Sequence, residues 1–445
     1  MTGKQITENL VILIWQNQIV NDLFTDMGEH VQVIFPGRVC TNGGCDLQDA
    51  VFVIEGEVMV GNIEVHVKSS YWYRHGHNKD SRYNDILLHV VMWHDCLSDT
   101  VLQNGKVIPT ISLSAFLAYP LSSLNGRVKL RRRRLFACPA IDRHLAGKSL
   151  VELLNATGKE RFNIKAALIR EDLIEQNAGQ VLFRNISRAL GYDKNTVPFE
   201  TLAHKLTLRA LEELKNKEDI FYRAFILGTA GLLVSQRLRV NQKSLCDPEI
   251  EQLETIWRSS SIATTMNQLN WCFFRVRPNN FPTRRLVALG YLVARYFQTG
   301  LLQGILNLVR RAYVEKVYSC IEGGLIVFRQ GYWANHSDFG MVMPRNIALL
   351  GKSKAAEIII NVLLPFAYAW GELVDELDLK DNAIKLYFGY PGLEDNQLTR
   401  FMRQQFSLNK DFRLSAAQQQ GLIHIFKTYC RYRNCQECPV SVRRG

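Results

Sequence analysis

The spacing of the apolar residues changes once along the chain, and this change restricts the possible folds more than any other feature of the sequence. Up to about residue 120, short apolar runs are separated by turn signals such as Asn104-Gly105, a pattern typical of strands. After Lys148, apolar residues recur at the spacing of amphipathic helices. A first helix is predicted over residues 8–26, and strands over 31–35, 50–60 with a kink at Gly56, 63–69, 85–94 and 107–113.

These two patterns predict an α+β protein built from two parts. Residues 1–120 are expected to form a compact mixed-sheet domain. Residues 121–148 would be a basic linker, and residues 149–445 a large, mainly helical domain that ends in a cysteine motif. A chain of 445 residues is long enough to bury more than one core.

Composition narrows the class of protein. The formal net charge is +12, which favours polyanions, above all nucleic acid, as partners. The longest apolar stretch, 358–370, is short for a membrane span and is flanked by Glu357 and Glu372, so it predicts a buried core helix. Ten cysteines without a secretory signal indicate reduced thiols or metal ligands and a cytoplasmic protein. The oligomeric state stays open.

The stretch from Gly61 to Lys68 carries the most specific chemistry. Glu64, His66 and Lys68 alternate with apolar residues, so in a strand the three polar side chains would share one face. Asp46, at the start of the preceding strand, would add a second carboxylate. Two carboxylates and a nearby base are what metal-dependent phosphodiester hydrolysis requires, so Asp46 and Glu64 are predicted to bind Mg²⁺ or Mn²⁺, with His66 or Lys68 as base. The alternative is a half-buried strand with a solvated polar face.

An aromatic and basic loop follows this strand, with the sequence Tyr-Trp-Tyr-Arg-His-Gly-His over residues 71–77. Arg74, His75 and His77 are predicted to contact nucleic acid, with the aromatic rings available for stacking. His75-x-His77 could also bind a metal, although no third ligand stands at a set spacing. The alternative is a loop that only packs its aromatics on the sheet. His89 alternates with apolar neighbours and is expected to be structural.

A cysteine motif lies near the C-terminus. Cys430, Cys435 and Cys438 have the spacing C-x4-C-x2-C, followed by Pro439, and thiolates at such spacing bind zinc or iron–sulfur clusters. The fourth ligand is predicted to be Cys138, which also precedes a proline. Cys246, Cys272 and Cys320 are alternatives, and unliganded thiols remain a second interpretation.

Two groups of arginines complete the predicted nucleic-acid surface. The first is the run Arg131, Arg132, Arg133 and Arg134, which could instead be a solvated linker. The second is a proline-containing stretch with Arg275, Arg277, Arg284 and Arg285, suited to phosphates. Its arginines could instead pair with acidic residues near 394–395 inside the helical domain, which would make them structural.

Two resemblances follow from these motifs. The arrangement of a helix, hairpin strands and a further strand, with Asp46 leading one strand and Glu64-x-His66 on the next, resembles the PD-(D/E)-x-K nuclease core. In that family two acids hold Mg²⁺ and a lysine positions or deprotonates the attacking water. This chain has His66 in the lysine position and Gly-Cys-Asp in place of Pro-Asp. Some nucleases of this core also use one distant cysteine and a C-terminal trio to close the domain, as here.

Over nearly its full length, the chain also resembles an uncharacterised bacterial family with members in Bacteroidetes and Chloroflexi. The motifs that carry this resemblance are 61–68, the loop up to His77, 85–91, 277–282 and the cysteine trio. It implies no activity. From the residues we expect a metal-dependent nuclease acting on DNA or RNA, with a [4Fe–4S] cluster or zinc at the cysteines. The alternative is a non-catalytic nucleic-acid-binding or scaffold protein with a structural metal site.

Overall fold

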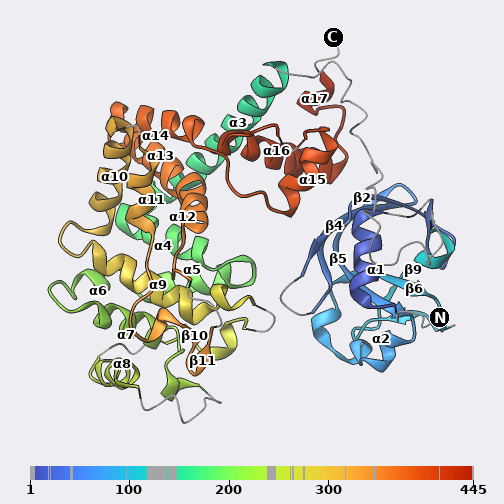
Figure 1. Ribbon diagram of the computed structural model, residues 1–445, viewed down its shortest axis with the longest axis horizontal. Helices are drawn as coiled ribbons and strands as arrows, with labels where there is room; N and C mark the ends of the chain where they lie inside the picture. Colours follow the sequence, from blue (N-terminus) through green and yellow to red (C-terminus); the bar gives the residue numbers. More distant parts are fainter. Residues whose placement is uncertain are drawn as a thin grey trace. The chain divides into compact units, whose positions relative to one another are not determined.

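The structure is a computed structural model that divides the chain into two compact units (Figure 1). Unit 1 comprises residues 1–157, 395–413 and 421–445, and unit 2 comprises residues 158–394 and 414–420. The structure describes residues 6–442 except 19, 21, 41–43, 97, 118–137, 139–147, 238–246, 261, 263–264, 274–275, 316, 344–346 and 410. Most of the predicted basic linker over 121–148 therefore lies outside the described residues.

Unit 1 is built on a mixed sheet of seven strands in the order β1-β2-β4-β5-β6-β9, with β3 paired to β4. The strands up to β5 pair antiparallel, whereas β5–β6 and β6–β9 pair parallel. The strands are β1 (Leu23–Phe24), β2 (His30–Phe35), β3 (Arg38–Val39), β4 (Leu47–Ile54), β5 (Glu57–Lys68), β6 (Ile86–Trp93) and β9 (Thr110–Ser112), with a separate hairpin of β7 (Thr100–Val101) and β8 (Val107–Ile108). The hairpin at Asn104-Gly105 is confirmed.

Several predicted elements of unit 1 are wrong at their boundaries; the strand expected over 107–113, for example, is β8 and β9, which lie in different sheets. The expected single strand over 50–60 is the end of β4 and the start of β5, joined by a tight turn in which Glu55 and Gly56 have φ of 47° and 92°. This positive φ makes Gly56 a hairpin residue, because successive left-handed residues reverse the chain where a kink would only bend it. The first helix, α1 (Glu8–Asn17), ends at Gln18 with φ of 49°, well before residue 26.

The sheet of unit 1 buries both of its faces. Helix α1 lies across one face (Figure 1), where Trp15 packs with strand residues such as Val65 and Val90 in one apolar core. The opposite face is covered by the segment of helix α2 (Tyr71–Arg74) and the 3₁₀ turns η1 (His77–Lys79) and η2 (Ser81–Tyr83). Trp72 anchors this second face in a smaller core with Ile86 and Ile108. Polar side chains of β5 and β6 that point away from α1 are therefore enclosed by the α2 segment.

The C-terminal part of the chain returns to unit 1. It contributes α15 (Gln397–Gln405), the end of α16 (Ala416–Thr428), the turn η12 (Cys430–Tyr432) and α17 (Pro439–Val442). Phe35 of β2 makes edge contacts with the rings of Phe401 and Phe426, at centroid distances of 5.0 and 5.2 Å. Residues from both ends of the sequence thus share one core.

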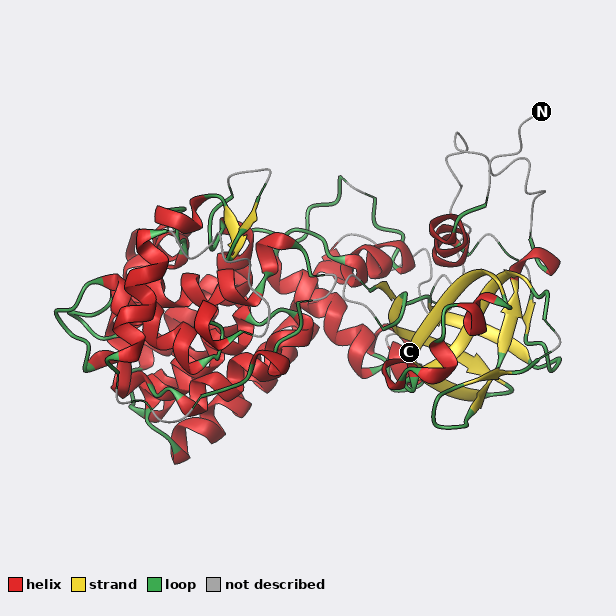
Figure 2. Ribbon diagram, turned by 90° about the horizontal axis from the view of Figure 1, so that it is seen from below, coloured by secondary structure: helices red, strands yellow, loops and turns green. Residues whose placement is uncertain are grey.

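Unit 2 is helical, with a short hairpin of β10 (His336–Asp338) and β11 (Met341–Val342) in its described part (Figure 2). Helix α3 (Lys148–Glu175) begins in unit 1 and continues into unit 2. The other helices are α4 (Ala178–Leu190), α5 (Thr196–Lys205), α6 (Leu208–Glu212), α7 (Asp219–Thr229), α8 (Pro248–Arg258), α9 (Pro282–Arg295), α10 (Leu301–Glu315), α11 (Tyr318–Leu325), α12 (Lys352–Ile358), the π-helical η11 (Ile359–Leu363), α13 (Leu364–Leu373) and α14 (Leu377–Gly389). The mixed-sheet and helical parts of the predicted α+β fold are confirmed.

One continuous helical stretch in the described residues, Lys352–Leu373, has the length and apolar composition to cross a bilayer. It comprises α12, η11 and α13, and 67% of its most apolar window is buried within the protein. Ile359, Leu363 and Phe366 are completely inaccessible in the core of unit 2. The stretch is therefore a core helix, as predicted for residues 358–370.

Candidate metal centre

Strand β5 places Glu64 and His66 on the face of the sheet that the α2 segment covers. Ile63 and Val65 point to the opposite face and are buried under α1. Side chains two residues apart share a face of a strand, so Glu64 and His66 lie side by side. Both are buried, with exposed fractions of 6% and 1%.

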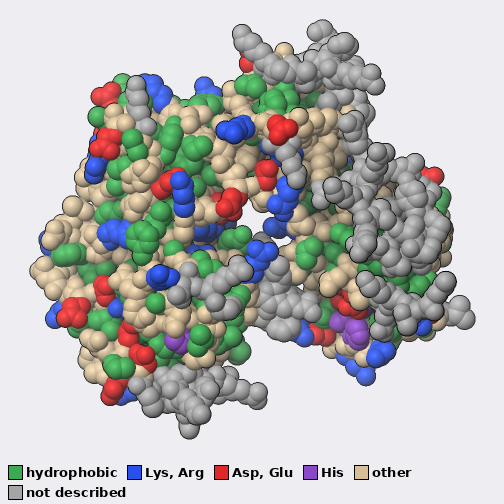
Figure 3. All heavy atoms as spheres, in the orientation of Figure 1, with side chains coloured by type: hydrophobic (Ala, Val, Ile, Leu, Met, Phe, Trp, Pro, Cys, Tyr) green, Lys and Arg blue, Asp and Glu red, His purple; other side chains and the backbone are tan. Residues whose placement is uncertain are grey.

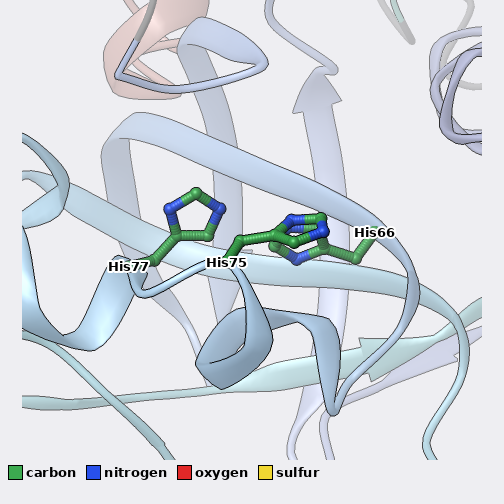
Figure 4. A group of neighbouring side chains, drawn as sticks. All are labelled: His66, His75 and His77. Carbon is green, nitrogen blue, oxygen red and sulfur yellow. The ribbon is translucent and has the colours of Figure 1, made fainter.

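Two more histidines reach this point from the loop after α2. The start of α2 is fixed by Asp95, whose carboxylate accepts hydrogen bonds from the Ser70 amide at 3.0 Å and the Ser70 hydroxyl at 3.1 Å. Trp72 also fixes this helix, because its indole N–H donates a hydrogen bond to the Val101 carbonyl at 2.9 Å. Gly76 then turns the chain back with φ of 75°, a conformation that glycine adopts without strain. This turn brings His75 and His77 over β5 (Figure 4).

The three imidazoles form a compact group. One ring nitrogen from each of His66, His75 and His77 lies within 4.8 Å of the other two, and among the described residues this is the one group of three or more potential ligands that meets this limit. His66 Nε2 lies 3.2 Å from His75 Nδ1. Glu64 Oε1 lies 3.4 Å from His77 Nε2 and 3.9 Å from His66 Nε2. Three ring nitrogens therefore converge, and a carboxylate oxygen of Glu64 lies beside two of the rings.

The group is open on one side. His66 and His77 are buried, whereas His75 is exposed. Figure 3 shows histidine side chains at the surface of unit 1, with acidic and basic side chains beside them. An ion held by these residues would keep contact with solvent or substrate on the His75 side, as catalytic metal sites do and closed structural sites do not.

A fourth histidine, His89 of β6, contacts the Nδ1 atom of His66. The parallel register sets His89 opposite Glu64, and His89 Nε2 lies 2.9 Å from His66 Nδ1. His89 Nδ1 lies 3.0 Å from the Thr100 hydroxyl, which lies 2.9 Å from that of Thr110. If His89 accepts the Nδ1 proton of His66, the lone pair of His66 Nε2 points into the group, as metal-bound histidines require.

The fold favours the neutral form of the His66 and His89 imidazoles. Burial, and then the positive charge that His89, His77 and His75 can carry, lower the pKa of His66 to about 2. Burial, and then His77 and His94, lower the pKa of His89 to about 3. A neutral imidazole is the form that binds a metal ion, so no proton need be removed from His66 near neutral pH.

Asp46 and Lys68 each have a partner outside this group. The Asp46 carboxylate accepts a hydrogen bond from the Val65 amide at 3.0 Å, and so is used on the backbone of β5. Lys68 lies at the exposed end of the strand and pairs with Asp95 at 3.4 Å. Of the predicted catalytic residues, Glu64 and His66 lie 3.9 Å apart, measured from Oε1 to Nε2.

The predicted arginines of unit 2 have structural surroundings. Arg284 is fully buried and donates to the carbonyls of Trp333, His336 and Ile347 at 2.7, 2.6 and 2.5 Å. Arg285 is also buried and donates to the Leu349 carbonyl at 2.8 Å. Neither guanidinium can reach a phosphate, so we withdraw both from the predicted nucleic-acid surface.

The remaining predicted basic residues differ in their surroundings. Arg277 is exposed. Arg74 is exposed beside His75, and its guanidinium lies 5.0 Å from the centre of the Tyr71 ring. Arg131, Arg132, Arg133, Arg134 and Arg275 lie outside the described residues.

Sequence reasoning identified Glu64, His66, His75 and His77 in two separate motifs but did not join them, and it treated His89 as structural. The joining depends on the reversal at Gly76 and on the parallel pairing of β5 with β6. One signal was present: four histidines stand within 24 residues of a predicted strand-rich segment, between positions 66 and 89. That density alone could have indicated a shared site.

The comparisons with known proteins give a family without an activity. A family model described as "Protein of unknown function (DUF2851)" matches residues 8–397. No curated protein matches the chain. No solved structure matches it either.

Proposed function

The chain belongs to the DUF2851 family, and we propose that it is a metal-dependent nuclease whose ion is held by His66, His75, His77 and Glu64. The observation that carries this proposal is the convergence of three imidazole nitrogens within 4.8 Å of one another, with the Glu64 carboxylate 3.4 Å from one of them. The exposed position of His75 leaves room for a water molecule and a substrate.

The ligands favour a transition ion. Imidazole nitrogens suit ions such as Zn²⁺, whereas Mg²⁺ prefers carboxylate and water oxygens. Three of the four groups here are imidazoles, so Zn²⁺ and Mn²⁺ fit better than the Mg²⁺ that two carboxylates would have held. A bound ion would supply Lewis-acid chemistry, activating a water and stabilising the charge on a phosphodiester oxygen.

The surrounding residues have supporting roles. His89 would keep the His66 lone pair directed at the ion, through the 2.9 Å contact between their rings. Arg74, exposed next to His75 and stacked on Tyr71, would attract a backbone phosphate to the open side.

Two features support a nucleic-acid substrate. The net charge of +12 favours binding to a polyanion. The resemblance to the PD-(D/E)-x-K core rests on a helix, two hairpin strands and a further strand, and the order of α1, the hairpin β4–β5 and β6 in unit 1 supports the proposal on this point.

A non-catalytic nucleic-acid-binding protein is the second candidate. Lys68 pairs with Asp95, and Asp46 bonds to the Val65 amide, so the lysine and the second acid of the nuclease pattern each have a structural partner. The same ion would then only stabilise the α2 segment.

The deciding experiment compares metal binding and cleavage in the full-length protein. Wild type should bind one Zn²⁺ or Mn²⁺ and cleave single- or double-stranded DNA or RNA when that ion is present. His75→Ala should lose both properties while remaining folded, because its side chain is exposed. His30→Ala, on strand β2 and also exposed, is the matched control and should behave as wild type.

Three outcomes separate the candidates. Loss of cleavage in His75→Ala alone supports the nuclease. Metal binding that depends on His75, with no cleavage of any of these substrates, supports the binding protein. Absence of metal from wild type, or equal cleavage by wild type and His75→Ala, contradicts the proposed site.

A further inference from the structure

The cysteines of the C-terminal motif lie on a tightly turned segment of unit 1. Cys430 begins the turn η12, and Arg433 follows with φ of 53°. The amides of Asn434 and Cys435 donate to the carbonyls of Tyr429 and Arg433 at 3.0 and 2.8 Å. Cys438 stands directly before α17 and is buried. These bonds fold the nine-residue motif back on itself and bring its thiols into one region.

The fourth cysteine comes from a distant part of the sequence. Cys138 belongs to the same unit, and its thiol interacts electrostatically with those of both Cys430 and Cys438. The other candidates differ: Cys272 and Cys320 belong to unit 2, and Cys246 lies outside the described residues. Unit 1 therefore gathers four thiols from two segments.

No disulfide joins the cysteines in the described part of the chain. A bound metal ion or cluster would hold the four sulfurs as thiolates, the form in which cysteine ligates metals.

We propose that Cys138, Cys430, Cys435 and Cys438 bind a [4Fe–4S] cluster. The spread of the thiols selects the cluster over a zinc ion. Zinc binds sulfur at about 2.3 Å in a tetrahedron, which sets the sulfurs roughly 3.8 Å apart. No three of these four described thiols lie within 4.8 Å of one another. A four-iron cluster holds its ligands further apart, because each thiolate binds a different corner iron.

The cluster would stabilise unit 1. Turn η12 contacts strand β2, so the C-terminal motif already lies against the sheet. Ligation by Cys138 would link that motif to the chain segment that follows the sheet, and so close a very long loop in the unfolded chain. These ligands are separate from the histidines and Glu64, so this site does not depend on the proposed nuclease activity.

The test uses the full-length protein purified without oxygen. Wild type should be brown, absorb broadly near about 400 nm, and contain iron and acid-labile sulfide in equal amounts, about four of each per chain. Cys138→Ser and Cys435→Ser should each lose most of the iron. Cys96→Ser, a partly exposed thiol of the same unit, should keep it.

The outcomes are distinct. Colourless wild type with one zinc per chain would overturn the cluster, and wild type without any metal would overturn the site. These measurements do not require a variant to fold. Full iron content in Cys138→Ser would exclude Cys138 as the fourth ligand. A cluster present in a protein without nuclease activity would support this inference and leave the histidine site to be judged separately.

Discussion

The two units bury polar side chains in opposite ways. In unit 2, two enclosed guanidinium groups end on acceptors: Arg284 on three carbonyls, and Arg237 on Asp338 at 2.7 Å and on Thr283 at 2.8 Å. In unit 1, the buried groups are imidazoles and a carboxylate whose nitrogen and oxygen atoms face one another.

This difference distinguishes buried polar groups that stabilise the fold from buried polar groups that can bind a ligand. Donors that meet acceptors hold a fold together and leave nothing to bind, whereas atoms with lone pairs that converge from several segments are arranged for a cation. Burial alone therefore does not mark a site; what matters is which atoms the buried groups present to one another.

The largest expected effect is a loss of stability when a structural arginine of unit 2 is removed. Arg284→Ala would leave one buried and two partly buried carbonyls without their donor, each costing about 1 kcal/mol, and would open a cavity where a fully buried side chain stood. We expect the free energy of unfolding of unit 2 to fall by about 3 kcal/mol or more, as measured by denaturant titration. Arg277→Ala, at an exposed site close in sequence, should change it by less than about 0.5 kcal/mol. Equal effects of the two substitutions would contradict the structural role of Arg284.

A second prediction tests the support behind the metal ligands. His89→Phe removes the partner of His66 Nδ1 without touching the group that faces solvent. We expect metal affinity to fall roughly 10- to 100-fold, as for other residues that orient metal-bound histidines. Competition with a chelator of known affinity measures this change. Unchanged metal affinity in the variant would mean that His89 only packs in the core and does not orient His66.

A third prediction concerns the metal-free protein in acid. The folded state holds the pKa of His66 and His89 well below the ordinary value of 6.5, so protons bind preferentially to the unfolded chain. Stability is then complete above about pH 6.5 and falls as the pH drops towards 3. Each histidine can contribute up to about 1.4 kcal/mol per pH unit.

Denaturant titrations in the presence of a chelator, at several values of pH, measure this slope. Glu64, His75, His77 and His94 are charged or ionisable groups near these rings, so the comparison is with the double variant His66→Gln/His89→Gln. The variant should show a shallower loss of stability in acid. Identical slopes would mean that neither imidazole is held neutral by the fold.

The smallest expected effect sharpens the assignment of the catalytic residues. Lys68 forms an exposed pair with Asp95, so Lys68→Ala should change stability by less than about 0.5 kcal/mol. Metal content and cleavage should both stay at the wild-type level. Normal metal content with strongly reduced cleavage would instead restore Lys68 as the base.

Local patterns predicted much of unit 1 and less of its site. Alternation along β5 correctly indicated that Glu64 and His66 share a face, because strand geometry alone determines this. The turn at Glu55-Gly56 was missed, since a glycine in an apolar run fits a kink as well as a hairpin, and only pairing of the flanking strands distinguishes them. Arg284 and Arg285 show the same limit, because exposed and buried arginines look alike in a sequence.

The sequence by itself determined the mixed-sheet and helical parts, the core helix around residues 358–370 and the residue types available for metal chemistry, because these depend on the spacing of neighbouring residues. Only the tertiary structure decided that His75 and His77 meet Glu64 and His66, that β6 supplies His89, and that the C-terminal segments join the sheet unit. Each of these depends on contacts between segments separated by turns or by much of the chain, and local spacing does not specify such contacts.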